Sequence, residues 1–154
     1  MAITNTTIIG LGNPILSDDS VGIKAARQLA EVLKDREDVE VVEVYAGGLR
    51  LMDALVGHGR AVIIDAMQTG APAGTVRRFS ISELPKTRNL ASSHDVDLPT
   101  ALETGRTLGL QMPEEITIFG IEAREVEQFG ESLSEEVQRA LGEVADRVCR
   151  MLEI

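Results

Sequence analysis

Short apolar runs alternate along this chain with longer segments in which apolar residues recur at helical spacing. Five runs have the character of β-strands and cover Thr4–Gly10, Val39–Tyr45, Ala61–Ala66, Thr75–Ser80 and Glu115–Gly120. Four segments have helical periodicity and cover Ser20–Lys34, Leu49–Val56, Asp95–Leu108 and Leu133–Leu152. The alternation of strands and helices predicts an α/β fold built on a largely parallel sheet.

The third strand and the last helix have the clearest patterns. The strand opens with consecutive apolar residues, Ala61 to Ile64, which is typical of a central strand covered on both faces. In the helix, apolar residues fall on a single stripe. Ser132 and Glu135 have the spacing of a capping box at its start. We therefore expect an amphipathic helix with one buried face.

The connection between the third and fourth strands is short and consists of turn residues, Thr69-Gly70-Ala71-Pro72-Ala73-Gly74. Because it leaves no room for a crossover helix, these two strands are expected to form an antiparallel hairpin. The sheet is then mostly parallel with one antiparallel strand. Two stretches, Glu83 to Ser93 and Ala123 to Glu131, lack a regular pattern. No repeat or linker divides the chain, so we expect one domain over residues 1–154.

Composition narrows the class of protein. Apolar residues make up 44% of the 154 residues and only four are aromatic, so an aliphatic core is expected. The formal charge of −10 argues against a nucleic-acid partner, because such proteins usually carry a basic face. The single cysteine, Cys149, excludes an intramolecular disulfide and fits a cytoplasmic protein. Met1 to Asn13 lacks a basic leader, and its apolar run is too short for a signal peptide or a membrane span.

The first turn carries the strongest chemical signal. It reads Gly10-Leu11-Gly12-Asn13-Pro14-Ile15-Leu16-Ser17-Asp18-Asp19-Ser20-Val21-Gly22. A strand leaves the sheet here, turns on glycines and brings two adjacent carboxylates to the start of a helix, where open α/β sheets place their ligands. Either aspartate could be the helix N-cap. A helix needs only one cap, so the second carboxylate is available for a cation or a proton transfer.

Asp65 and His94 are the other candidate site residues. Asp65 ends the third strand, which should be a neighbour of the first strand across the switch point. Its alternative role is to cap the following turn. His94 lies in Ser92-Ser93-His94-Asp95 at the start of a predicted helix, where a neutral ligand or base suits the helix dipole; a solvated loop histidine is the alternative. His58, between two glycines at the opposite edge of the sheet, is expected to be an exposed loop histidine.

Asp19, Asp65 and His94 together could form a site of two carboxylates and one imidazole. This ligand set suits zinc, nickel, manganese or iron, and three protein ligands leave an open position for a substrate. Other schemes fit poorly. The chain has no His-Glu-x-x-His or Gly-x-Ser-x-Gly motif. The first turn lacks the third glycine of a dinucleotide site, and Cys149 lies within the last helix, where a cysteine is usually inert.

In this order the motifs closely resemble those of the hydrogenase maturation endopeptidases. The matching positions are Gly10-x-Gly12-Asn13, Asp18-Asp19-x-x-Gly22, Asp65-Ala66, Pro72-x-Gly74 and His94. In that family the second acid, the aspartate ending the third strand and the later histidine bind metal, which implies these roles for Asp19, Asp65 and His94. The resemblance also implies a three-layer α/β/α sandwich, phosphorylase/hydrolase-like, around a five-stranded mixed sheet.

The activity that this resemblance implies is unusual. Such enzymes remove a C-terminal extension from the large-subunit precursor of a [NiFe] hydrogenase after nickel has been inserted. The nickel then belongs to the substrate, and the three ligands can be empty in the resting enzyme. The implied partner is the precursor, with no nucleic acid and no membrane. The sequence leaves the oligomeric state open, a monomer included.

Two alternatives stay open at this point. Peptidyl-tRNA hydrolases share the Gly-Leu-Gly-Asn-Pro turn, but the segment Ile15 to Ser20 lacks their catalytic histidine. A non-catalytic module that binds nickel or the precursor would use the same three ligands. The chain also departs from the family after its second strand, where Tyr45-Ala46-Gly47-Gly48-Leu49 replaces a common Asp-x-Gly-Thr. This departure bears on the identity of the client hydrogenase.

Overall fold

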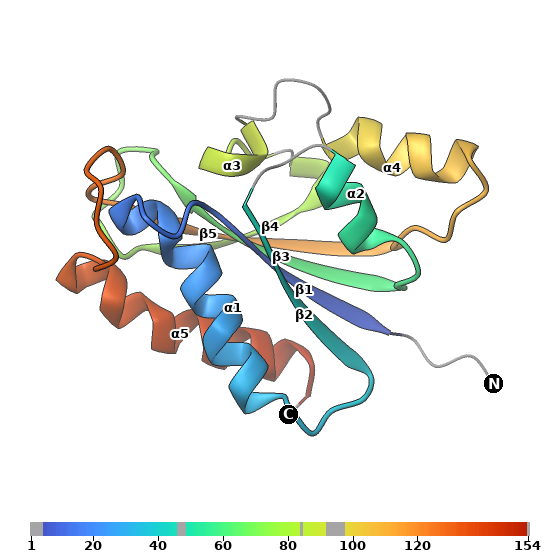
Figure 1. Ribbon diagram of the computed structural model, residues 1–154, viewed down its shortest axis with the longest axis horizontal. Coiled ribbons are helices and arrows are strands. Elements are labelled where there is room, and N and C mark those ends of the chain that lie inside the picture. The colour runs from blue at the N-terminus through green and yellow to red at the C-terminus, as the bar shows by residue number, and fades with distance from the viewer. Residues whose placement is uncertain (1–4, 46–48, 84, 92–97, 154) are drawn as a thin grey trace.

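The computed structural model describes residues 5–45, 49–83, 85–91 and 98–153. These residues build a five-stranded sheet with the spatial order β2-β1-β3-β5-β4 (Figure 1). The strands are β1 (Thr6–Leu11), β2 (Val39–Val44), β3 (Arg60–Met67), β4 (Val76–Ser80) and β5 (Glu115–Glu122). All neighbouring pairs are parallel except β4 with β5. The predicted mostly parallel sheet with one antiparallel strand is confirmed.

Helices cover both faces of the sheet. They are η1 (Ser17–Ser20), α1 (Val21–Val32), α2 (Leu49–Leu55), η2 (Ile81–Glu83), α3 (Arg88–Ala91), α4 (Leu98–Thr107) and α5 (Glu135–Met151). Figure 1 shows α1 and α5 on one face and α2 and α4 on the other, with α3 near the end of β3. This arrangement is the predicted three-layer α/β/α sandwich. Within the described residues, no helix is long and apolar enough to cross a membrane.

The central strands are buried on both faces. Successive side chains of a strand point to opposite sides of the sheet, so Val62 and Ile64 of β3 pack on the side of α1 and α5. Ala61 and Ile63 pack on the side of α2 and α4. The unbroken apolar pattern of this strand therefore supplies two cores at once, as predicted. Both cores are mainly aliphatic.

The predicted hairpin between the third and fourth strands is wrong. β5 lies between β3 and β4 and pairs with both, parallel to β3 and antiparallel to β4. The burial of the side chains explains why β5 and not β4 lies beside β3. β5 is buried from Ile116 to Glu122, which suits an interior place in the sheet. β4 carries the exposed Arg77 and Arg78 and therefore suits an edge.

Two local predictions also need correction. The stretch from Glu83 to Ser93 was expected to be irregular, but it contains the short helix α3. The predicted capping box at Ser132 is wrong, because α5 has Ser134 as its N-cap and no side-chain cap bond. The hydroxyl of Ser134 instead donates to Asp18, 2.7 Å away. The stretch Ala123 to Glu131 is irregular as predicted.

Candidate functional site

Two glycines bring the acidic turn against the ends of the strands. A Cβ on Gly10 would lie 2.2 Å from the carbonyl oxygen of Gly22. A Cβ on Gly22 would lie 2.3 Å from the carbonyl oxygens of both Leu11 and Ile64. Only glycine permits so close an approach of backbone to backbone. The start of α1 therefore rests directly on β1 and β3, and η1 holds its aspartates at the carboxyl edge of the sheet.

Asp19 is the aspartate that faces the site. Its side chain is 3% exposed. Oδ2 accepts a hydrogen bond from the backbone N–H of Asn13 at 3.0 Å. Oδ1 accepts from Asn89 Nδ2 at 2.9 Å and pairs with Arg88 Nε at 2.9 Å. Burial raises the pKa of this carboxyl above its ordinary value, against the opposing effects of Asn89 and Arg88.

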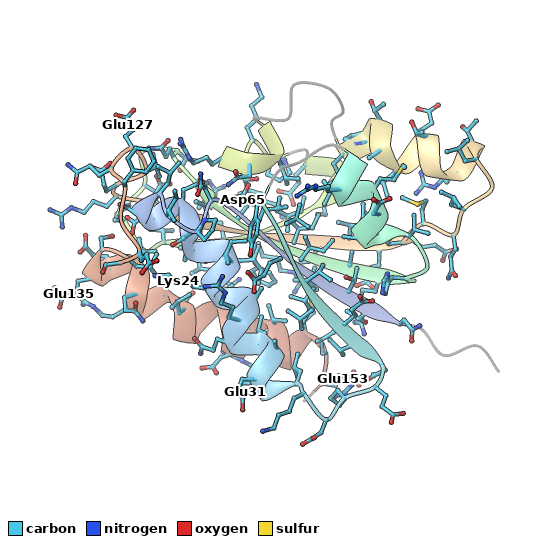
Figure 2. The ribbon with its side chains drawn as sticks, viewed as in Figure 1. Lys24, Glu31, Asp65, Glu127, Glu135 and Glu153 are labelled. Carbon is cyan, nitrogen blue, oxygen red and sulfur yellow. The ribbon has the colours of Figure 1, made fainter. Side chains whose placement is uncertain are left out.

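Asp65 lies two residues before the end of β3, because the strand extends to Met67 and does not end at Asp65 as expected, and it is fully buried. Figure 2 shows it inside the molecule near α3, whereas Glu127 and Glu135 lie at the periphery. Oδ2 accepts from the backbone N–H groups of Asn89 at 2.6 Å and Leu90 at 3.1 Å, so the carboxylate holds the start of α3. Burial raises the pKa of Asp65 to about 6, although these bonds lower it.

Asn89 joins the two carboxylates. Its amide nitrogen Nδ2 donates to Asp19 Oδ1 at 2.9 Å and to Asp65 Oδ1 at 2.8 Å. Two aspartates that are 46 positions apart in sequence therefore converge on one nitrogen atom. The predicted neighbourhood of the first and third strands is confirmed, since Gly10 of β1 pairs with Ile64 of β3.

Asp18 has a structural role that differs from the predicted one. Neither aspartate caps α1, whose N-cap Ser20 makes no side-chain cap bond. Asp18 is fully buried and accepts hydrogen bonds from the backbone N–H groups of Arg124, Glu125 and Ser134 and from the Ser134 hydroxyl. Burial alone would raise the pKa of Asp18, but these bonds outweigh it and hold the pKa below its ordinary value. Asp18 ties the segment after β5 to the acidic turn.

Of the two histidines, His58 is among the described residues and His94 is not. His94 lies outside the described residues, so its predicted place beside Asp19 and Asp65 stays a prediction. His58 precedes β3 at the opposite edge of the sheet, as expected. It is less exposed than predicted, since its side chain is 12% exposed and its Nε2 lies 2.9 Å from Glu40 Oε2.

The donor set at this edge fits a cation. Carboxylate oxygens are common ligands of divalent metals, and the oxygens of Asp19 and Asp65 already share one polar hydrogen-bond donor. Among the described residues, no group of three histidine, cysteine or acidic side chains gathers around one point. The described part of the chain therefore brings two carboxylates, Asp19 and Asp65, to one point, and their oxygens could serve as metal ligands.

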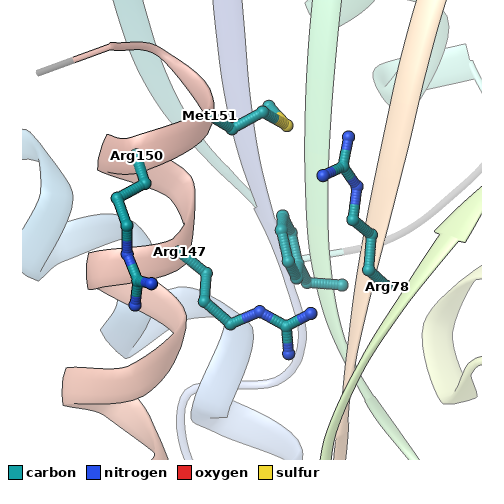
Figure 3. Close-up of a pocket in the computed structure, with 5 residues that line it drawn as sticks. Arg78, Arg147, Arg150 and Met151 are labelled. Carbon is teal, nitrogen blue, oxygen red and sulfur yellow. The ribbon is translucent and has the colours of Figure 1, made fainter.

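A separate cavity lies away from these aspartates. It has a volume of about 310 Å³ and is lined by Arg78, Phe119, Arg147, Arg150 and Met151 (Figure 3). The lining residues come from β4, β5 and α5, and Arg147 stacks over the ring of Phe119 at 5.5 Å. Neither Asp19 nor Asp65 contributes to its walls, so the cavity is distinct from the candidate site.

Sequence reasoning missed Arg88 and Asn89. They lie in a helix of four residues, too short to produce an apolar periodicity that could be recognised. The one signal available was their position a few residues ahead of His94. Glu122 was missed as well. It is buried at the end of β5, and its carboxylate accepts from the backbone N–H and the hydroxyl of Thr69.

The family model and the similar proteins all concern the maturation or formation of hydrogenases. A family model described as hydrogenase maturation protease matches residues 23–151. The hydrogenase expression/formation proteins HupD of Rhizobium leguminosarum bv. viciae and HoxM of Cupriavidus necator are 23% and 25% identical to this chain. Each alignment covers 94% of this chain and 72% of the relative.

Solved structures show the same fold. The hydrogenase maturating endopeptidase HybD from E. coli has a TM-score of 0.79 at 21% identity, over 97% of this chain and 93% of that one. The [NiFe] hydrogenase maturation protease HybD from Thermococcus kodakarensis has a TM-score of 0.71 at 29% identity, over 96% and 99% of the two chains. Because the family model spans most of the sequence, this chain belongs to the hydrogenase maturation protease family.

Proposed function

We propose that this protein is a cytoplasmic endopeptidase that removes the C-terminal extension of a nickel-loaded [NiFe] hydrogenase large-subunit precursor. Asp19, Asp65 and His94 recognise the nickel that the precursor carries. The observation that supports this most directly is the convergence of Asp19 and Asp65 on one nitrogen atom at the carboxyl edge of the sheet. Family membership supplies the reaction class.

Asp19 and Asp65 have different hydrogen-bond partners, and these suit them to different roles in the reaction. Asp19 is fixed by the Asn13 backbone at Oδ2, which leaves Oδ1 directed at the shared point. Asp65 is held by Asn89 and Leu90 and has a pKa of about 6. A carboxyl whose pKa is raised towards neutrality suits a group that takes a proton from an attacking water.

The substrate's nickel ion, once bound, supplies a Lewis acid that can polarise a carbonyl group. The chain's own contribution is to hold two carboxylates at a fixed separation in a buried setting, where a charge is screened less than in water. A site that lacks a full ligand set binds a cation well only when the partner brings the remaining ligands. This property would restrict recognition to precursors that carry the metal.

The alternatives are less well supported. A peptidyl-tRNA hydrolase would require a basic surface for its substrate, whereas this chain has a net charge of −10 and belongs to a protease family. A non-catalytic module that binds the metal-loaded precursor would use the same carboxylates. Turnover separates this module from the protease, because only an enzyme processes many precursor molecules per chain.

The direct test is intact mass spectrometry of the protein mixed with a cognate large-subunit precursor, with and without nickel, at one enzyme per hundred precursors. We expect loss of a C-terminal peptide from the nickel-loaded precursor alone and more than one turnover per chain. No cleavage of a folded, nickel-loaded cognate precursor would contradict the proposal. Cleavage limited to one precursor per chain would contradict catalysis.

Variants assign the roles within the site. Asp65→Asn should lower the processing rate by at least about a hundredfold, the usual contribution of a positioned acid–base group. His94→Ala, which removes a proposed ligand of the substrate's nickel, should also lower the rate strongly. His58→Ala is the matched control, because it removes the other histidine at the opposite edge of the sheet and should leave the rate unchanged. Full activity in His94→Ala would contradict its assignment as a ligand.

A further inference from the structure

The contacts of Asn89 and Arg88 fill the point where a cation would bind. The amide nitrogen of Asn89 lies 2.9 Å from Asp19 Oδ1 and 2.8 Å from Asp65 Oδ1. The guanidinium Nε of Arg88 lies 2.9 Å from the same Asp19 oxygen. Both residues belong to α3, and together we call them the Arg88–Asn89 clamp. The clamp therefore binds the two carboxylate oxygens that face the shared point, Asp19 Oδ1 and Asp65 Oδ1.

The clamp offsets an electrostatic cost. Two buried carboxylates that face one another repel, and burial raises the pKa of each. The partial positive charge of the amide hydrogens and the full charge of the guanidinium stabilise the pair in the absence of any metal ion. The backbone N–H of Asn89, 2.6 Å from Asp65 Oδ2, anchors the clamp from the same helix.

A metal ion and the clamp cannot share this position. Carboxylate oxygens bind transition metals at roughly 2.0–2.2 Å, whereas both oxygens are now occupied by the same nitrogen at hydrogen-bond distance. A cation bound between Asp19 and Asp65 must displace the Asn89 amide and takes over the charge compensation that Arg88 provides. At the point between the two Oδ1 atoms, a metal ion and the Asn89 amide therefore exclude one another.

We propose that the Arg88–Asn89 clamp is an internal substitute for the metal ion, which keeps the Asp19–Asp65 pair closed until a metal-bearing substrate displaces it. This inference rests on the proposed metal-recognition role of the two aspartates. It adds a selectivity device to that role. A precursor without nickel offers no cation to replace the clamp, so the carboxylates stay occupied by the protein's own donors.

The test measures nickel binding in the absence of any precursor. Isothermal titration with Ni²⁺ is carried out on the full-length wild type, Asn89→Ala and Arg88→Gln. Removal of the clamp amide should tighten Ni²⁺ binding by roughly ten- to a hundredfold, the strength of a hydrogen bond to a charged group. Arg88→Gln should tighten it by a smaller factor, because the Arg88 side chain is 31% exposed and its charge is partly screened.

A second measurement separates the clamp from a merely structural role. Without metal, Asn89→Ala should melt at a lower temperature than the wild type, and Ni²⁺ should raise its melting temperature by more. Gln68→Ala is the matched control. Gln68 accepts a long hydrogen bond of 3.3 Å from Arg88 Nη1, which leaves the bonds of Asn89 and Arg88 Nε to the carboxylates in place, so both quantities should stay at wild-type values.

Unchanged or weaker Ni²⁺ binding in Asn89→Ala and Arg88→Gln would overturn the proposal, because the residues would then support the site instead of competing for it. Binding below detection in the wild type and in both variants would overturn it as well. If Asn89→Ala fails to fold, Arg88→Gln alone decides. Failure of the proposed function is recognised separately, as absence of precursor processing by the wild type although Asn89→Ala and Arg88→Gln bind Ni²⁺ more tightly than the wild type does.

Discussion

At the scale of single residues, Asp18 ties two distant segments of the chain together. Its buried carboxylate accepts four hydrogen bonds from Arg124, Glu125 and Ser134. Asp18→Asn replaces one acceptor oxygen by a donor that faces these N–H and O–H groups. We expect the free energy of unfolding to fall by about 3 kcal/mol, as for buried groups that lose a charged partner. Urea denaturation measures the loss.

A matched acid shows whether this loss comes from burial. Asp35 is exposed, and Asp35→Asn should leave the urea midpoint unchanged. A helix-cap role for Asp18, as the sequence suggested, would predict a loss of only about 1 kcal/mol in Asp18→Ala. A loss of that size in both Asp18 variants would contradict the role of tying the segment after β5 to the acidic turn.

Cys149 provides a residue-scale test of the chemistry. It lies half-buried in α5, and burial together with the neighbouring charge of Asp146 raises the pKa of its thiol. The thiolate is the reactive form, so labelling by a disulfide reagent at pH 8 should be slower than for a free cysteine peptide. Cys149→Ser should process the precursor at the wild-type rate. Loss of processing would mean that the thiol takes part in the site.

At the scale of elements, the close approach of α1 to the sheet positions the acidic turn. In Gly22→Ala the new Cβ would lie 2.3 Å from two backbone oxygens, so α1 must move away from β1 and β3. We expect a loss of stability of more than about 3 kcal/mol, beyond ordinary overpacking of a core. Thermal and urea unfolding measure it.

The control for this prediction lies in another helix. Gly142 of α5 is exposed, and a Cβ there would meet nothing within 4 Å. Gly142→Ala should therefore stabilise the protein by about 1 kcal/mol through helix propensity alone. If both variants lost stability equally, the argument from close backbone approach would fail.

The positions of the strands and long helices could be predicted from the sequence, but the order of the strands in the sheet could not. The apolar periods located the five strands and the long helices, and strand-end logic brought Asp19 and Asp65 to one edge. Periodicity carries no information about which strand lies beside which, so the place of β5 between β3 and β4 was missed. The clamp was missed because a helix of four residues leaves no periodic trace.

At the scale of the whole molecule, each side of the sheet needs its own core, and the sheet needs protected edges. The two cores were predictable because β3 is apolar on both faces. The protection of the sheet edges could not be predicted from the sequence, because it depends on contacts between distant side chains and single backbone groups. At the β4 edge, Arg147 Nη1 donates to the carbonyl oxygen of Val76, and Glu83 accepts from the N–H of Ser80.

These contacts occupy two backbone groups of the β4 edge, one at each end of the strand, and so make it a poorer template for pairing with a second chain. Arg147→Ala frees the Val76 carbonyl and removes a positive charge beside the exposed Arg78. We expect this variant to self-associate at concentrations where the wild type keeps its own oligomeric state, as measured by light scattering after size exclusion. Arg139→Ala removes the same charge from the same helix, where the side chain pairs with the exposed Glu135, and should behave as the wild type. Equal self-association of both variants would show that net charge, and not the covered carbonyl, controls association.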